Sequence, residues 1–157
     1  SLLSRGIEAD ILPTCRELGI SVTAYGVLSR GLLSGHWTRE RSANSSDYRS
    51  ISPRFQGENV ERNLALVEAL RAVANAKGAT VAQLAVAWVL SRGSDIVPLI
   101  GARRRDQLAD GLAALALDLT PDDIARIEQA VPAGAAAGDR YPTMQMAHLD
   151  SERRKTA

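Results

Sequence analysis

The chain is poor in the side chains that most often carry metal and nucleophile chemistry. Its 157 residues include one cysteine, Cys15, which excludes an internal disulfide bond and a cysteine-based zinc site and favours a location in the reducing cytoplasm. The two histidines, His36 and His148, lie in a predicted loop and in the tail, so they offer little to a metal site or a serine–histidine hydrolase. The two lysines, Lys77 and Lys155, lie at a predicted helix end and near the chain end, where neither is held rigidly enough for catalysis.

Long apolar runs and the common nucleotide motifs are also absent. No stretch approaches the roughly 18 consecutive apolar residues of a membrane span. The sequence has no Walker loop, no GxGxxG after a strand and no GxSxG turn. A formal charge of +1 gives no general attraction to nucleic acid or to a membrane, so we expect neither as a partner and any charge argument has to be local.

The apolar residues predict helices that alternate with two strands. A helix over 10–18 ends at Gly19, and a short β-branched strand follows over 20–25. Residues 26–59 carry no sustained period and predict a long loop with room for one short helix. Next come a predicted helix that includes 64–74 and ends at Lys77 and Gly78, and a second helix from the capping pair Thr80 and Gln83 to Gly93. A strand is predicted over 96–100. Two helices follow it, one with Leu108, Leu112 and Leu115 on one face, and one that starts at Thr120 and carries Ile124, Ile127 and Val131.

This order is typical of parallel α/β layers, yet two strands are too few for one. A sheet of two parallel strands leaves edges and apolar faces uncovered. We therefore expect residues 1–132 to be part of a larger α/β unit. The Ala- and Gly-rich stretch 133–138 predicts a flexible linker, and the tail up to Ala157, with Arg153, Arg154 and Lys155, predicts a solvated or partly ordered end.

Three consecutive arginines, Arg103, Arg104 and Arg105, stand between the second predicted strand and a helix. A helix N-terminus already carries about half a positive charge, so a cluster of cations there is favourable only when an anion binds. The placement predicts a site for the phosphate of a nucleotide. Gln107 and Asp110, one helical turn apart, could both reach such a ligand. The alternatives are a solvated basic turn without a ligand and two ordinary surface residues.

The end of the first predicted strand is the second candidate for chemistry. Tyr25 lies at the carboxyl end of that strand, where parallel sheets bind ligands and where its ring could stack on a planar group. Gly26 and Gly31 would let backbone N–H groups approach a phosphate closely. The alternative is that Tyr25 is half-buried packing and that the glycines only shape a turn.

Several stretches together resemble the aldo-keto reductase family. They are residues 15–20, 24–25, 28–35, 53–56, 83–90 and 96–104, in unbroken order. The resemblance implies a (β/α)8 barrel that binds an extended NADPH without a Rossmann motif and reduces aldehydes and ketones by hydride transfer. The chain resembles the second half of that barrel, with strands seven and eight at 20–25 and 96–100. We therefore expect an α/β fold that is a partial TIM barrel, incomplete on its own.

The resemblance also implies cofactor-binding residues. Tyr25 matches the family's aromatic residue under the nicotinamide ring. The stretch that follows the pyrophosphate is matched by Gly26, Val27, Leu28, Ser29 and Gly31, and the turn and helix that hold the 2′-phosphate and adenine by Gly101, Arg103, Arg104, Gln107, Asp110 and Gly111. The family usually has Ser-Pro in place of Gly26-Val27 and Asn in place of Gly111, so we expect weaker or altered cofactor affinity.

The family's catalytic Asp, Tyr, Lys and His belong to the first half of the barrel and have no counterpart here. The resemblance thus implies a fragment that carries the cofactor-binding half, is inactive alone, and acts on a small-molecule carbonyl substrate only as part of the full-length form. The alternative is a non-catalytic nucleotide-binding or interaction protein that associates, with itself or another chain, through the exposed edges of an open half-barrel.

Overall fold

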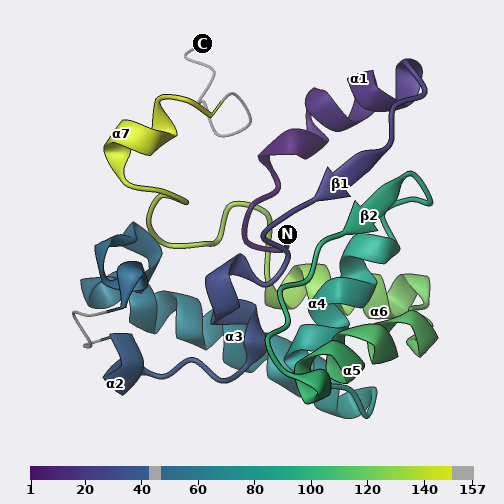
Figure 1. Ribbon diagram of the computed structural model, residues 1–157. Coiled ribbons are helices and arrows are strands. Elements are labelled where there is room, and N and C mark those ends of the chain that lie inside the picture. The colour runs from purple at the N-terminus through teal and green to yellow at the C-terminus, as the bar shows by residue number, and fades with distance from the viewer. Residues whose placement is uncertain (43–46, 150–157) are drawn as a thin grey trace.

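The computed structural model describes residues 1–42 and 47–149 (Figure 1). Within that part of the chain, two short strands, β1 (Val22–Ala24) and β2 (Ile96–Pro98), form one sheet. The strands run parallel, with Val22 opposite Ile96 and Ala24 opposite Pro98, which confirms the predicted parallel arrangement. Both are shorter than predicted, because ladder pairing joins only three residues of each strand.

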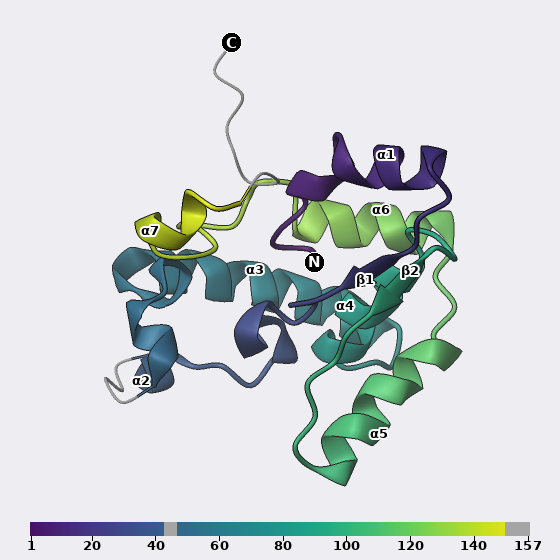
Figure 2. The same cartoon turned by 45° about the horizontal axis from the view of Figure 1, so that its top comes forward.

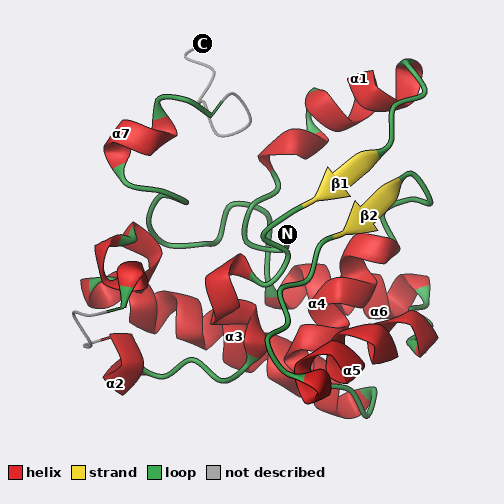
Figure 3. Cartoon of the chain, in the orientation of Figure 1, coloured by secondary structure: helices red, strands yellow, loops and turns green. Residues whose placement is uncertain are grey.

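Helices make up most of the remaining chain, so the fold is a helix-rich α/β arrangement (Figure 3). The two strands lie over α4, and α4 contacts β2, α3 and α5 (Figure 2). The α-helices are α1 (Ile11–Glu17), α2 (Arg39–Ser42), α3 (Gly57–Ala76), α4 (Val81–Leu90), α5 (Arg105–Ala113), α6 (Pro121–Ala130) and α7 (Thr143–Met146). The 3-10 helices are η1 (Gly6–Glu8), η2 (Ser29–Ser34), η3 (Tyr48–Ile51), η4 (Pro53–Phe55) and η5 (Ala114–Ala116).

The central helix α4 is buried on nearly all sides and starts at a capping box. Thr80 Oγ1 accepts a hydrogen bond from the Gln83 amide at 3.1 Å, and Gln83 Oε1 accepts one from the Thr80 amide at 3.0 Å. The Thr120 N-cap of α6 is built in the same way with Asp123. Both predicted helix starts are confirmed, because each cap satisfies amides that have no partner inside the helix.

No single helix in the described ranges is long and apolar enough to cross a membrane. Only α3 and α4 counted together pass that test, and they are bent by 84° at the break between them.

The prediction of a mostly irregular segment over 26–59 is wrong for its described part. Four short helices, η2, α2, η3 and η4, follow one another there before α3 begins at Gly57. Leu32 and Leu33 are fully buried, and the Trp37 and Phe55 rings meet edge to face with centroids 5.0 Å apart. Short 3-10 turns lack the sustained 3.6-residue period that predicts a helix, so the sequence pattern could not reveal them.

The face of α5 that the sequence marks as apolar has no cover in the described structure. Leu108, Leu112 and Leu115 are 51%, 53% and 69% exposed. Leu115 also lies in η5 rather than in α5. A leucine on a helix of a globular protein normally faces the core, so this face is open to a further packing partner.

Residues 133–138, for which composition predicts a flexible linker, contact the helical layer at their end. The buried Asn63 side chain of α3 donates to the Ala137 carbonyl at 2.9 Å and accepts from the Ala137 amide at 2.8 Å. Gly138 O accepts from Arg54 Nε at 3.4 Å. The tail residues Arg153, Arg154 and Lys155 lie outside the described residues.

Candidate functional site

The two segments singled out in the sequence face each other across a cleft of about 740 Å³. Each segment follows the carboxyl end of a strand, and parallel strands bring those ends to the same edge of a sheet. The cleft is lined by Gly26, Val27, Leu28 and Gly31 from the first segment and by Gly101, Arg103, Arg104, Gln107, Asp110 and Gly111 from the second. Tyr25 and Ser29 line a neighbouring cavity of about 130 Å³, which shares Gly26 and Arg30 with the cleft.

The turn after β1 has an unusual backbone. Gly26 and Gly31 have φ of +69° and +92°, a region that only glycine adopts at little cost. Ser29 and Arg30, which are not glycines, also have positive φ, at 48° and 57°. Such residues are strained and persist only where the surrounding structure holds them, which is common at binding sites. Val27 is only 1% exposed, so little of it faces the cleft.

The N-terminus of α5 differs from the predicted arrangement. The Gln107 side chain curls back, and its Oε1 accepts from the Arg103 and Arg104 amides at 3.0 and 3.2 Å. Two amides expected to face an anion are therefore already bonded. Arg104 Nε donates to Asp106 Oδ1 at 2.9 Å, and this hydrogen bond lowers the pKa of Asp106 to about 2.

Asp110 and Gly111 attach α5 to the elements beside it. Asp110 Oδ1 accepts from Gln83 Nε2 at 2.7 Å, so this carboxylate lines the cleft and also joins α5 to α4. A Cβ added to Gly111 would lie 3.0 Å from Ile100 Cδ1. Glycine at this position therefore allows α5 to pack closely against the segment after β2.

Three arginines that the sequence pattern did not indicate also line the cleft: Arg30, Arg41 and Arg49. Arg49 and Arg41 lie over the Trp37 ring, with Cζ 4.1 and 5.4 Å from its centroid. These three arginines belong to the segment that the sequence predicts to be a long loop. Several arginines near Trp37 were the sequence signal that could have indicated them. Arg49 is paired with the Asp47 carboxylate, and this hydrogen bond lowers the pKa of Asp47 to about 2. The positive charge that these residues bring to the cleft therefore comes from Arg30 and Arg41.

Residues 140–141, which the sequence predicts to be part of the tail, lie beside Tyr25. The Tyr25 side chain is 54% exposed, and the Tyr141 hydroxyl donates to the Tyr25 hydroxyl at 3.4 Å. The Arg140 guanidinium lies 4.7 Å from the centroid of the Tyr25 ring. A cation over one aromatic face is a favourable contact, so residues 140–141 pack against the predicted stacking residue.

Among residues 1–42 and 47–149, no group of three or more His, Cys, Asp or Glu side chains is placed to hold a metal ion.

Comparison with known proteins decides the family. The model of the aldo/keto reductase family matches residues 1–132. This chain belongs to the aldo/keto reductase family. It is 42% identical over 141 residues to "Probable aldo-keto reductase 1" of Glycine max, a match that covers 90% of the chain and 40% of that protein.

A solved relative agrees with this assignment. The glycerol dehydrogenase of Gluconobacter oxydans superposes with a TM-score of 0.78 at 33% identity, over 88% of this chain and 42% of that one. The chain thus spans about two fifths of the length of the relatives it matches. The predicted resemblance is confirmed, and the chain is similar to oxidoreductases with a (β/α)8 barrel.

Proposed function

We propose that the chain binds NADPH along the cleft and forms the cofactor-binding half of an oxidoreductase that reduces aldehydes and ketones. The observation that carries this proposal is the meeting of the two predicted cofactor segments, 26–31 and 101–111, across one cleft of about 740 Å³. That volume is within the usual range for a site that encloses a ligand of cofactor size. When bound, NADPH supplies the hydride for the carbonyl carbon.

The residues of the cleft suit an elongated, negatively charged ligand. Gly26 and Gly31 keep the turn after β1 free of side chains, so that a phosphate can approach its backbone. Arg103 and Arg104 at the start of α5 would hold the adenosine 2′-phosphate, and Arg41 adds positive charge to the same cleft. Arg49 would contribute less, because Asp47 already pairs with it. Tyr25 would stack against the nicotinamide ring from the neighbouring cavity.

In this proposal β1 and β2 are strands seven and eight of a (β/α)8 barrel whose first half lies outside this sequence. The proton-transfer residues belong to that half, so the chain alone is inactive and the small-molecule carbonyl substrate is turned over only by the whole barrel. We place this activity in the cytoplasm. Gly26-Val27 and Gly111, where the family usually has Ser-Pro and Asn, would weaken or alter cofactor affinity.

A double variant, Arg103→Ala with Arg104→Ala, tests the cofactor assignment. A charge-assisted hydrogen bond contributes roughly 1.5–3 kcal/mol, so each lost contact to the 2′-phosphate weakens NADPH about 10- to 100-fold and leaves NADH nearly unaffected. The expected loss is nearer the lower figure, because Arg104 must leave Asp106 before it can bind phosphate. Calorimetric titration of both cofactors measures the difference.

The matched control is Arg126→Ala, which removes an exposed arginine from α6, outside the cleft. This variant should bind both cofactors as the unmodified chain does. Equal losses of NADPH and NADH in the double variant would place the arginines elsewhere and contradict the assignment.

A second candidate function is supported by the open face of α5. Leu108, Leu112 and Leu115 expose half or more of their surface, which suits a non-catalytic nucleotide-binding or interaction protein that pairs its half-barrel with another chain. The oligomeric state of the isolated chain tests this candidate.

A further inference from the structure

The small cavity beside Tyr25 has a distinct chemical character. It encloses about 130 Å³ and is lined by three arginines, Arg30, Arg54 and Arg140. Three serines, two tyrosines, Gly26 and Phe55 complete the wall, and none of the described residues that line it is acidic. A cavity of this size and charge suits a small anionic group rather than an apolar one.

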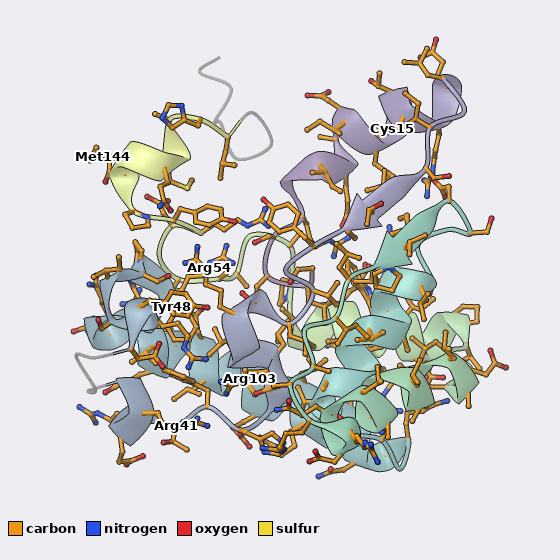
Figure 4. The ribbon with its side chains drawn as sticks, viewed as in Figure 1. Cys15, Arg41, Tyr48, Arg54, Arg103 and Met144 are labelled. Atoms are coloured by element: carbon orange, nitrogen blue, oxygen red, sulfur yellow. The ribbon has the colours of Figure 1, made fainter. Side chains whose placement is uncertain are left out.

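The inner wall of the cavity is held rigidly by Arg54. This residue is only 6% exposed, and its Nη1 donates to Ser4 Oγ at 2.9 Å while its Nε donates to Gly138 O at 3.4 Å. Figure 4 shows Arg54 beside the segment that leads to α7, away from Arg103. Because the guanidinium stays charged and is shielded from water, its attraction for an anion in the cavity is stronger than at the surface.

The outer wall is built from stacked cations and rings. Arg30 lies 4.4 Å from the centroid of the Tyr141 ring, and its Nη1 donates to Ser52 Oγ at 3.0 Å. Arg140 lies over the rings of both Tyr25 and Tyr141, at 4.7 and 5.3 Å. These contacts fix two guanidinium groups at the mouth of the cavity before any ligand arrives.

The positive charge around the cavity lowers the pKa of the Tyr141 phenol. Burial acts to raise its pKa, but the hydrogen bond with Tyr25 and the charges of Arg140 and Arg30 act more strongly together, so the pKa of Tyr141 is below its ordinary value. Surroundings that make a phenolate easier to form also attract a carboxylate or a phosphate.

We propose that this cavity binds an anionic oxygen group of the carbonyl substrate, so that the substrates are aldehydes and ketones that carry a carboxylate or a phosphate. The inference rests on the proposed function, because it takes Tyr25 as the place of the nicotinamide ring. Arg103 and Arg104, proposed to bind the cofactor, line the cleft and not this cavity. Arg54 and Arg140 line the cavity and not the cleft, and Arg30 lines both. Guanidinium forks match the planar oxygen pair of a carboxylate.

Binding measurements on the chain itself test the inference, since they require no turnover. The probes are para-formylbenzoate, which carries an aldehyde and a carboxylate, and its neutral methyl ester. Each is titrated by calorimetry into the unmodified chain and into Arg140→Gln, with Arg126→Gln as the matched control outside both cavities. NADPH is titrated into the same three proteins.

The expected result separates the two ligands. Arg140→Gln weakens para-formylbenzoate about tenfold or more, leaves NADPH within about twofold, and the methyl ester binds poorly to every protein. The Tyr141 phenol, followed by its ring resonances in NMR, also titrates at higher pH in Arg140→Gln, which shows a folded variant that has lost the local charge. Arg126→Gln changes none of these values.

Each other outcome identifies which idea has failed. Equal binding of the ester, unchanged affinity in Arg140→Gln, or no binding of para-formylbenzoate overturns the substrate inference. A parallel loss of NADPH in Arg140→Gln also overturns it, because the cavity then takes a phosphate of the cofactor. If para-formylbenzoate binds as expected and NADPH does not bind at all, the proposed function fails and the anion site stands.

Discussion

Asn63 connects three parts of the chain that are far apart in sequence. This side chain is fully buried in α3, and its Nδ2 donates to the Arg54 carbonyl at 3.0 Å and to the Ala137 carbonyl at 2.9 Å. Its Oδ1 accepts from the Ala137 amide at 2.8 Å. The residue therefore holds the backbone of η4 and the end of the segment 133–138 against α3, and with them the walls of the cavity beside Tyr25.

Replacing Asn63 by alanine removes all three hydrogen bonds at once. A buried polar group left without a partner costs about 1–3 kcal/mol, and water can reach the partly exposed Ala137 more easily than the region around Asn63. The expected loss is about 2–4 kcal/mol in the free energy of unfolding, a large share of the roughly 5–15 kcal/mol of a typical domain. For a chain of this size, that corresponds to a fall in Tm of roughly 4–16 °C.

Thermal unfolding and hydrogen exchange measure the two parts of this prediction. Asn63→Ala should unfold at lower temperature and should exchange the amides of residues 133–141 faster, because that segment is no longer held. Asn75→Ala is the matched control, since Asn75 is exposed on the same helix. A Tm unchanged from that of the unmodified chain, with unchanged exchange over 133–141, would refute the view that this segment is docked.

A pair of glycines tests the docking independently. Gly138 has φ of +81°, and a Cβ there would lie 2.8 Å from Asn59 Nδ2 and 2.9 Å from the Pro53 carbonyl oxygen. Gly134 has a similar φ of +78°, but a Cβ there would meet nothing within 4 Å. Both alanine variants carry similar backbone strain, so a greater loss of stability in Gly138→Ala measures the close contact with Asn59 and Pro53. Equal losses would speak against that contact.

Two further perturbations have defined outcomes. The pKa of Asp123 is lowered to about 2 by the Lys77 ammonium, 2.7 Å away, and by hydrogen bonds from the Thr120 amide and hydroxyl. The ionised carboxylate therefore stabilises the fold above the ordinary aspartate pKa near 4, and this stabilisation is lost as the pH falls toward 2. The difference in Tm between the unmodified chain and Asp123→Asn should be constant above about pH 4 and should shrink toward pH 2; a difference that does not depend on pH would contradict this. For the open face of α5, sedimentation should show association of the chain that Leu112→Lys abolishes and Met144→Lys, at an exposed residue on α7, does not. A monomeric unmodified chain would exclude association through this face.

The parts of the fold that depend on local sequence could be predicted well. Thr80 with Gln83 specifies a helix start because both partners lie within one turn, and Thr120 with Pro121 does the same. The parallel strands were found from short β-branched runs between helices. In each case the stabilising contacts lie within a few residues of the pattern that predicts them.

The parts of the fold that depend on contacts between residues far apart in sequence could not be predicted. The stretch 133–138 is rich in Ala and Gly and has no side chain that indicates docking, since its contacts with Asn63 and Arg54 are made by backbone groups. Arg140 and Tyr141 were assigned to a tail for the same reason, and their position beside Tyr25 depends on that docking. The sequence therefore predicts two segments of the candidate site, 26–31 and 101–111. It does not predict the third segment, residues 140–141, because the stretch 133–138 before it carries no recognisable pattern.

The basic turn before α5 is partly neutralised within its own helix. Three adjacent arginines at a helix N-terminus predict an anion, but Asp106 and Gln107 of the same helix already satisfy Arg104 and two backbone amides. An exposed ion pair is worth about 0–1 kcal/mol, so a phosphate can replace Asp106 at little cost. The turn on its own is therefore weak evidence for a ligand. The stronger evidence is that the segment after β1, which includes Arg30, and the first turn of α5 line one cleft together with Arg41 from a third part of the chain. Arg49 lines the cleft as well, but it is already paired with Asp47.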